Sequence, residues 1–256
     1  MESSERIELP ASFEDVSIDH LVLLIADMLE RLIAHNDQIP LVPEGLTRFH
    51  SRAAPNISVL DYLRRIVRFT NVEKACLLLT LHYIDQICAR MPLFTLSSLT
   101  AHRFIVASVA ISSKAFCDAF CTNSHYAKVG GISIVELNVL EREFLRIIDW
   151  DLTCTRELLQ EYYVNLVRTH SSGKFVIPTT QQSSSGSSDS EIEVDSGRSR
   201  PMSPVEGNSH AGHPPVPHGA STILIDTATL SPQPSQGPTI EQNMAFAALR
   251  ESMDQS

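Results

Sequence analysis

The sequence has 256 residues, of which 43% are hydrophobic and 20% are charged, and its formal net charge at pH 7 is −10. That length suffices for one sizeable folded domain with additional segments. The acidic balance argues against a direct nucleic-acid partner, which normally needs a lysine- and arginine-rich surface, and no apolar run approaches the ~18 residues of a membrane span, so no membrane partner is expected.

Composition changes near residue 170. All five tyrosines and the single tryptophan precede this point, whereas nine of the 14 prolines follow it. A segment dominated by proline, serine and glycine cannot bury enough apolar surface to fold alone. We therefore predict an N-terminal helix and connector over residues 1–49, a folded core over 50–170 and a disordered Ser/Pro-rich tail over 171–256. In that tail, Ser203 and Ser231 each precede a proline and are candidate phosphorylation sites.

The five cysteines contain no CxxC pair, and the first residues, MESSERIELPASFEDV, lack the basic and apolar regions of a secretory leader. We therefore expect an intracellular, reducing environment with free thiols. Cys117, Cys121 and His125 recur every fourth residue, but three ligands near the end of a helix favour apolar packing of the thiols over a zinc site. We expect neither a metal nor another cofactor.

In chain order, the first predicted helix covers residues 18–36, where apolar side chains recur at helical spacing. Three prolines mark residues 37–55 as a connector. Ser58 can cap a second helix that continues to about residue 69. The stretch 72–91 is apolar nearly all round and ends before Pro92, which indicates a central buried helix.

The second half of the core continues the helical pattern. Residues 97–120 are rich in alanine and serine, whose small side chains let helices approach closely, so a second central helix is predicted. The polar run that ends in Gly130 and Gly131 is predicted to be a loop. Ser133 and Glu136 form a capping-box pattern that starts the next helix.

That helix is predicted to end near residue 148, and a last helix covers residues 155–168. No segment sustains the period-2 alternation of a strand. The predicted fold is therefore all-α, with five or six helices joined by short loops.

Two charged side chains fall inside apolar stripes. At 100° per residue, Leu137, Phe144 and Ile148 lie within about 60° of Glu141, and small apolar residues surround Lys114 in the same way. An unpaired buried charge costs several kcal/mol. Two explanations stay open from the residues alone. Either Lys114 pairs with Glu141 or extends to water, or both flank an exposed apolar patch that binds a partner protein.

Five sequence blocks resemble the cyclin family. They are ISVLDYLRRI at 57–66, HYIDQI at 82–87, LTAHRF at 99–104, ISSKAFCD at 111–118 and TNSHYAKVGGISIVELNVLEREFL at 122–145. The last block is the most specific, and it is similar to the fungal phosphate-pathway cyclins. The resemblance covers about residues 50–170 and implies a five-helix cyclin box there.

The resemblance implies a kinase-binding role for Lys114 and Glu141. These positions match the lysine and the glutamate with which cyclins grip backbone groups at the start of the αC helix of a cyclin-dependent kinase. A lysine only donates and an ionised glutamate only accepts, so together they suit both polarities of a peptide group. Holding αC inward lets its glutamate pair with the β3 lysine that orients ATP. The partner of Glu141 would then lie on another chain.

The resemblance also implies a structural ion pair. Asp85 matches an aspartate that cyclins pair with an arginine of the first box helix, for which Arg65 is the first candidate and Arg64 the second. The chain departs from the family in other respects. Ala115 stands where many cyclins carry an aromatic residue, the hydrophobic substrate-docking hexamer of cell-cycle cyclins is absent, and no second cyclin box is visible.

The implied protein is a regulatory subunit, not an enzyme, that activates a cyclin-dependent Ser/Thr kinase in phosphate signalling. The resemblance extends the expected partners to transcription-factor substrates and a kinase inhibitor, and the expected location to nucleus and cytoplasm. Two alternatives stay open: a transcription-factor module of cyclin-like fold, which the acidic core disfavours, and a scaffold that binds a kinase without activating it. No nucleophile–base pattern or phosphate-binding glycine motif indicates catalysis.

Overall fold

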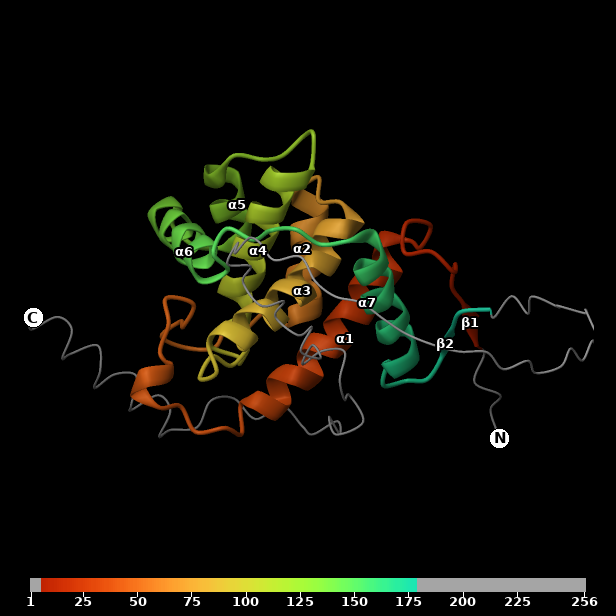
Figure 1. The fold of residues 1–256 in the computed structure, drawn as a ribbon, viewed down its shortest axis with the longest axis horizontal. Helices are drawn as coiled ribbons and strands as arrows, with labels where there is room; N and C mark the ends of the chain where they lie inside the picture. Colours follow the sequence, from red (N-terminus) through yellow and green to blue (C-terminus); the bar gives the residue numbers. More distant parts are fainter. Residues whose placement is uncertain (1–5, 179–256) are drawn as a thin grey trace, which may run out of the picture. The chain divides into compact units, whose positions relative to one another are not determined.

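The computed structural model describes residues 6–178, which form seven α-helices, one short 3-10 helix and two short strands (Figure 1). The elements in chain order are β1 (Ile7–Glu8), α1 (Ile18–Asn36), η1 (Pro43–Gly45), α2 (Val59–Phe69), α3 (Lys74–Arg90), α4 (Ala101–Phe116), α5 (Asn123–Gly130), α6 (Ile134–Ile147), α7 (Arg156–Thr169) and β2 (Phe175–Val176). The predicted all-α class is confirmed. Within this part of the chain, every helix is too short or too polar to cross a membrane.

Hydroxyl side chains start five of the described helices. Each cap accepts a hydrogen bond from the backbone N–H three residues later, which satisfies one of the free donors of the first turn. The five caps are Ser17, Ser58, Thr122, Ser133 and Thr155. The helix starts predicted at Ser58 and Ser133 are confirmed.

Helix α4 packs against four other helices, α2, α3, α5 and α6. Its small side chains permit the close approach that the sequence predicts. Ala107 and Ala110 are fully buried, and Ser108 Oγ lies 2.8 Å from Thr80 Oγ1 of α3. The two helices that were predicted to be central, α3 and α4, therefore form the middle of the core.

Five aromatic rings fill this core. Phe104 of α4 and Phe144 of α6 have ring centroids 5.2 Å apart, and Tyr83 of α3 lies edge-on to Phe144 at 5.4 Å. Phe49, from the predicted connector, is completely buried at 5.4 Å from Phe104, and Phe94 lies 5.9 Å from the same ring. Offset and edge-to-face ring pairs of this kind stabilise the fold by more than the burial of their apolar area alone. The connector is therefore anchored in the core.

The segment that was predicted to be a loop forms helix α5. Thr122 caps its start, and three of its side chains are buried: Tyr126, Ala127 and Val129. Gly131, at φ +72°, ends it in the left-handed region that glycine tolerates. The loop prediction was wrong because two glycines and a polar composition outweighed a short apolar stripe. Helix α4 correspondingly ends at Phe116 rather than near residue 120.

Two short strands extend the folded unit at both ends. β1 pairs in parallel with β2, and the chain between β1 and α1 is held against α7, where Tyr163 Oη donates to Pro10 O at 2.7 Å. The sequence predicted no strand, because a two-residue pairing has no periodicity to detect. Residues 171–178, which were assigned to the tail, belong to the folded unit. Residues 179–256, with the candidate sites Ser203 and Ser231, lie outside the described part of the chain.

Gly130 lets α5 approach α4 closely. A Cβ at this position would lie 2.7 Å from Val106 Cγ2 and 3.2 Å from Tyr62 Oη, which donates to Gly130 O. We expect Gly130→Ala to lower the free energy of unfolding by about 1–3 kcal/mol, because the stiff Val106 side chain must move within a packed core. Urea unfolding followed by circular dichroism measures this change, and an unchanged midpoint would contradict the close approach.

His50 is buried and neutral in the folded chain. Its Nδ1 accepts from Thr47 N at 3.1 Å, the residue is 5% exposed, and burial lowers its pKa to about 4. An unfolded histidine titrates near ~6.5. The unfolded chain therefore binds more protons between these two values, so stability falls as the pH drops from about 6.5 to about 4.

The free energy of unfolding of the wild type should be lower at about pH 4.5 than at about pH 7. We expect His50→Gln to reduce this difference by about 2–3 kcal/mol. Urea unfolding of the wild type and the variant at both values measures it. The same pH dependence in both proteins would show that His50 does not carry this acid sensitivity.

Candidate functional site

Helices α4, α5 and α6 pack against one another (Figure 1), and Lys114 of α4 meets Glu141 of α6. Lys114 Nζ forms an ion pair with Glu141 Oε1 and donates to Asn123 Oδ1 at 3.1 Å. Asn123 Nδ2 donates to Glu141 Oε2 at 2.7 Å and to Asn138 Oδ1 at 2.8 Å. The Lys114 and Glu141 side chains are 26% and 18% exposed, so this Lys114–Asn123–Glu141 cluster is partly open to solvent.

The charge of Glu141 is thus matched within one chain. The last turn of α4 brings the Lys114 ammonium to the carboxylate, so Glu141 has a partner within its own chain. That it also meets a partner on another chain stays a prediction. The intramolecular pairing that the residues left open is confirmed. The pair nevertheless retains hydrogen-bonding capacity, since Lys114 has a third N–H and each carboxylate oxygen has a second lone pair.

Asn123 is a cluster residue that the sequence analysis missed. It is the first residue of α5, directly after the Thr122 cap. Because this segment was predicted to be a loop, nothing placed its amide near α4 or α6. The signal that could have found it is the Thr-Asn pair before a short apolar stripe, which is a helix-start pattern.

A second ion pair joins α4 to α6, about three helical turns before Lys114 along α4. Arg103 Nη2 lies 2.5 Å from Glu136 Oε1 and also donates to Arg48 O at 2.8 Å. Burial lowers the pKa of Arg103, and the charge of Glu136 opposes that shift. The two ion pairs fix α6 against α4, so the cluster is carried by rigid helices rather than by loops.

Exposed apolar side chains lie on α4 and α6, which carry Lys114 and Glu141, and just after the ends of these helices. Ile134 is 45% exposed and lies two turns before Glu141 on the same face of α6. Phe116 and Phe120, at and after the end of α4, are 47% and 54% exposed, and Trp150, after α6, is 71% exposed. We call Phe116, Phe120, Ile134 and Trp150 the apolar rim. Exposed aromatic residues on helices that also carry a partly exposed charged pair, and at their ends, are typical of a protein-binding surface.

The backbone at Trp150 has an unusual conformation. Asp149 and Trp150 have φ angles of 54° and 60°, the left-handed region that costs a non-glycine residue about 1–3 kcal/mol. Trp150 N donates to Leu145 O at 2.9 Å, which closes the end of α6. The helix end therefore holds the single tryptophan of the chain in solvent. The sequence analysis did not single out Trp150.

A family model described as Cyclin matches residues 19–152. The chain belongs to the cyclin family. The match begins in α1, so the likeness starts earlier in the chain than residue 50, where the sequence analysis placed it. Helix α1 packs against α2, α3 and α7 and is therefore part of the same unit as the cyclin box.

Two fungal relatives share about the same sequence identity with this cyclin. Nuc-1 negative regulatory protein preg of Neurospora crassa is 42% identical over 158 residues, which cover 60% of this chain and 33% of the relative. PHO85 cyclin PHO80 of Saccharomyces cerevisiae is 43% identical over 149 residues, or 57% of this chain and 51% of the relative. The chain thus spans a third and about half of the lengths of these two proteins.

A third relative is covered more fully. PHO85 cyclin-like protein psl1 of Schizosaccharomyces pombe is 36% identical over 173 residues, which are 63% of this chain and 70% of the relative. The predicted resemblance to fungal phosphate-pathway cyclins is confirmed by the two relatives above.

Arg65 and Asp85 do not form the predicted ion pair in this cyclin. Asp85 is 8% exposed, and its Oδ2 accepts from Tyr162 Oη of α7 at 2.5 Å. Arg65 Nη2 instead donates to Lys128 O of α5 at 3.2 Å, and Arg64 forms its ion pair within α2. The pair was predicted wrongly because Arg65 lies on the side of α2 that meets α5, whereas Asp85 lies on the side of α3 that meets α7.

Removing the Tyr162 hydroxyl tests this arrangement. Tyr162→Phe takes a hydrogen bond from a buried carboxylate, so we expect the free energy of unfolding to fall by about 1.5–3 kcal/mol. Tyr163→Phe is the matched control. Its hydroxyl donates to the neutral carbonyl of Pro10, and its loss should cost about 1 kcal/mol. If urea unfolding shows equal losses of stability for the two variants, the hydrogen bond to the Asp85 side chain is no stronger than the one to the Pro10 carbonyl, which would contradict this expectation.

Two of the three candidate metal ligands, Cys117 directly after α4 and His125 of α5, have separate partners. Cys117 Sγ lies 3.4 Å from Cys76 Sγ of α3, and His125 Nε2 lies 2.6 Å from Phe69 O of α2. Among residues 6–178, no group of three or more His, Cys, Asp or Glu side chains is arranged to hold a metal ion.

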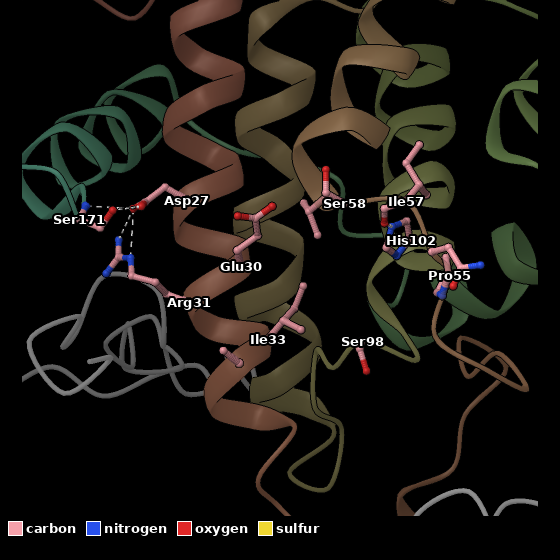
Figure 2. A pocket seen from close by; sticks show the side chains of 13 residues that line it. Asp27, Glu30, Arg31, Ile33, Pro55, Ile57, Ser58, Ser98, His102 and Ser171 are labelled. Carbon is pink, nitrogen blue, oxygen red and sulfur yellow. Dashed lines mark hydrogen bonds and ion pairs between the residues drawn. The ribbon is translucent and has the colours of Figure 1, made fainter. Parts of the chain in front are cut away.

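A groove of about 560 Å³ lies between α1 and the starts of α2 and α4 (Figure 2). Asp27 and Arg31 of α1 form an ion pair at 3.0 Å on one wall. Burial raises the pKa of Glu30, which also lines the groove. His102 Nε2 lies 2.9 Å from Ile57 O on the opposite side. The groove therefore offers both charged and apolar contacts between α1 and the start of α2.

Proposed function

We propose that this cyclin is the regulatory, non-catalytic subunit of a cyclin-dependent Ser/Thr protein kinase, which it binds and activates. The observation that carries the proposal is the partly exposed Lys114–Asn123–Glu141 cluster, with the apolar rim on α4 and α6 and just after their ends. Relatives whose names describe PHO85 cyclins support a kinase of the PHO85 type.

The cluster presents a donor and an acceptor at fixed positions. The start of a kinase αC helix has free backbone N–H groups, and the chain before it has free carbonyls. Glu141 accepts from the former and Lys114 donates to the latter, using the hydrogen-bonding capacity that the intrachain pair leaves. Because the side chains are already held by one another and by Asn123, little conformational entropy is lost on binding.

Activation follows from where αC is held. With αC turned inward, its glutamate pairs with the β3 lysine that positions the ATP phosphates. The cyclin binds this arrangement better than the outward one, so binding shifts the population of the kinase toward the active state. The apolar rim supplies the buried contact area around the polar cluster.

We further propose phosphate signalling as the process, with transcription factors as substrates of the complex, a kinase inhibitor as an additional partner, and the nucleus and cytoplasm as the location. The support is the likeness to a Neurospora crassa protein named as a negative regulator of Nuc-1 and to a Saccharomyces cerevisiae PHO85 cyclin.

Reconstitution with a PHO85-type kinase tests the proposal. The two purified proteins should co-elute in size-exclusion chromatography, and phosphate transfer to a Ser-Pro peptide should rise at least about tenfold over the kinase alone. Co-elution without stimulation would identify a non-activating scaffold. Absence of both effects would contradict the proposal as a whole.

A further inference from the structure

Helices α2 and α5 concentrate positive charge in an acidic chain. α2, VLDYLRRIVRF, carries three arginines and one acidic residue, Asp61, and α5, NSHYAKVG, carries Lys128, His125 and no acidic residue. The whole chain, by contrast, has 20 lysines and arginines and 30 acidic residues. A solvated helix face in such a chain would be expected to mix both signs or to be acidic.

Three hydrogen bonds between side chains and backbone carbonyls join α2 to α5. Tyr62 Oη donates to Gly130 O at 3.2 Å, and Arg65 Nη2 donates to Lys128 O at 3.2 Å. His125 Nε2 of α5 lies 2.6 Å from the carbonyl oxygen of Phe69, which is one turn after Arg65 and the last residue of α2. The two helices therefore lie side by side (Figure 1), and Arg65 and His125 lie at the contact between them.

We define the α2–α5 edge by six residues: Arg64, Arg65, Arg68, Phe69, His125 and Lys128. Arg64, Arg68 and Lys128 are exposed. The Arg68 guanidinium lies 5.4 Å from the centroid of the Phe69 ring, which is itself 52% exposed. Arg64 pairs with Asp61 at 3.5 Å, but both side chains are more than half exposed, and such a surface pair is weak. The edge thus combines available cations with an apolar anchor.

The edge is separate from the kinase-binding cluster. On α5, His125 and Lys128 lie about 60° apart, and both point about 140–160° away from Asn123. Asn123 contacts Lys114 and Glu141, on the side of α4 and α6. Helix α5 therefore stands between the two surfaces, and a ligand on the edge leaves the cluster free.

We propose that the α2–α5 edge is a docking surface for an acidic peptide segment of a partner protein. Arginine guanidinium groups bind carboxylates in a planar, two-bond geometry, and Lys128 adds a further cation. Phe69 contacts an apolar side chain between the acidic residues of the segment. Charge complementarity selects this partner class, since the remainder of the acidic cyclin repels acidic segments and directs them to this edge.

Fluorescence anisotropy of the full chain tests the proposal with a labelled peptide that has glutamates on both sides of one leucine. The triple variant Arg64→Glu, Arg68→Glu, Lys128→Glu should weaken binding at least about tenfold. The matched control is Arg6→Glu, Arg52→Glu, Lys174→Glu, which changes the same net charge at exposed positions outside α2 and α5. It should retain affinity within about twofold at physiological salt.

Far-UV circular dichroism establishes that each variant is folded, and glutamine substitutions at the same three positions replace the glutamates if the first variant unfolds. No binding of the peptide to the wild-type chain would overturn the proposal, as would equal losses in the test and control variants. A single-stranded oligonucleotide that displaces the peptide and binds more tightly would show a nucleic-acid surface instead. Because the assay contains no kinase, its outcome is independent of the proposed kinase activation.

Discussion

The double variant Lys114→Ala, Glu141→Ala is expected to raise the cyclin concentration that half-maximally stimulates the kinase at least about a hundredfold while remaining folded. Both side chains would make charge-assisted hydrogen bonds at the centre of the interface, where truncation costs about 2 kcal/mol or more per residue. Removing both leaves no unpaired charge, and the side chains are 26% and 18% exposed, so stability should change little.

Phosphate transfer by the reconstituted kinase measures the first effect, and thermal unfolding measures the second. The matched control is Glu143→Ala, Arg146→Ala, which removes an ion pair of 2.8 Å from the same helix. It should keep stimulation within about twofold, because Arg146 is 70% exposed and an ion pair this open to solvent contributes little. A folded Lys114→Ala, Glu141→Ala variant that stimulates like the wild type would remove the cluster from the interface.

Phe144→Ala should produce the largest loss of stability, about 3–5 kcal/mol. The ring is fully buried, and its centroid lies 5.2 Å from Phe104, 5.4 Å from Tyr83 and 6.0 Å from Phe49. Truncation would open a cavity that α3, α4 and the connector cannot fill without moving together. A domain of ordinary stability, about 5–15 kcal/mol, would lose a large part of it.

Urea unfolding measures this loss, with Val135→Ala of the same helix as the control. Val135 is 69% exposed, so its truncation should change the free energy of unfolding by less than about 0.5 kcal/mol. A cost below about 1 kcal/mol for Phe144→Ala would contradict the aromatic core.

Features with local causes could be predicted from the sequence. Ser58 and Ser133 mark helix starts because a cap needs only its own first turn. The buried central helices were also predictable, since their composition excludes an exposed face. Helix α5 was missed because its buried stripe is short and is followed by Gly130 and Gly131. Phe49 was missed because a lone aromatic residue in a proline-rich connector has no periodicity.

The candidate site was only half predictable. Helical geometry placed Lys114 and Glu141 inside apolar stripes, but their meeting depends on how α4 packs against α6, which no local pattern fixes. The family resemblance implied a role for both residues. It also implied an ion pair between Arg65 and Asp85, which does not form. There the neighbouring C-terminal carbonyls of α5 attract the guanidinium, and Asp85 is satisfied by Tyr162 instead. Tertiary contacts decide which of several partners a long side chain meets.

Hydrogen–deuterium exchange of the cyclin with and without the kinase tests the central claim most directly. If the cluster and the apolar rim bind the kinase, amide exchange should slow in residues 114–123 and 134–150, and stay unchanged in α7. Slower exchange confined to other segments, or no change on adding the kinase, would contradict the assignment of this surface.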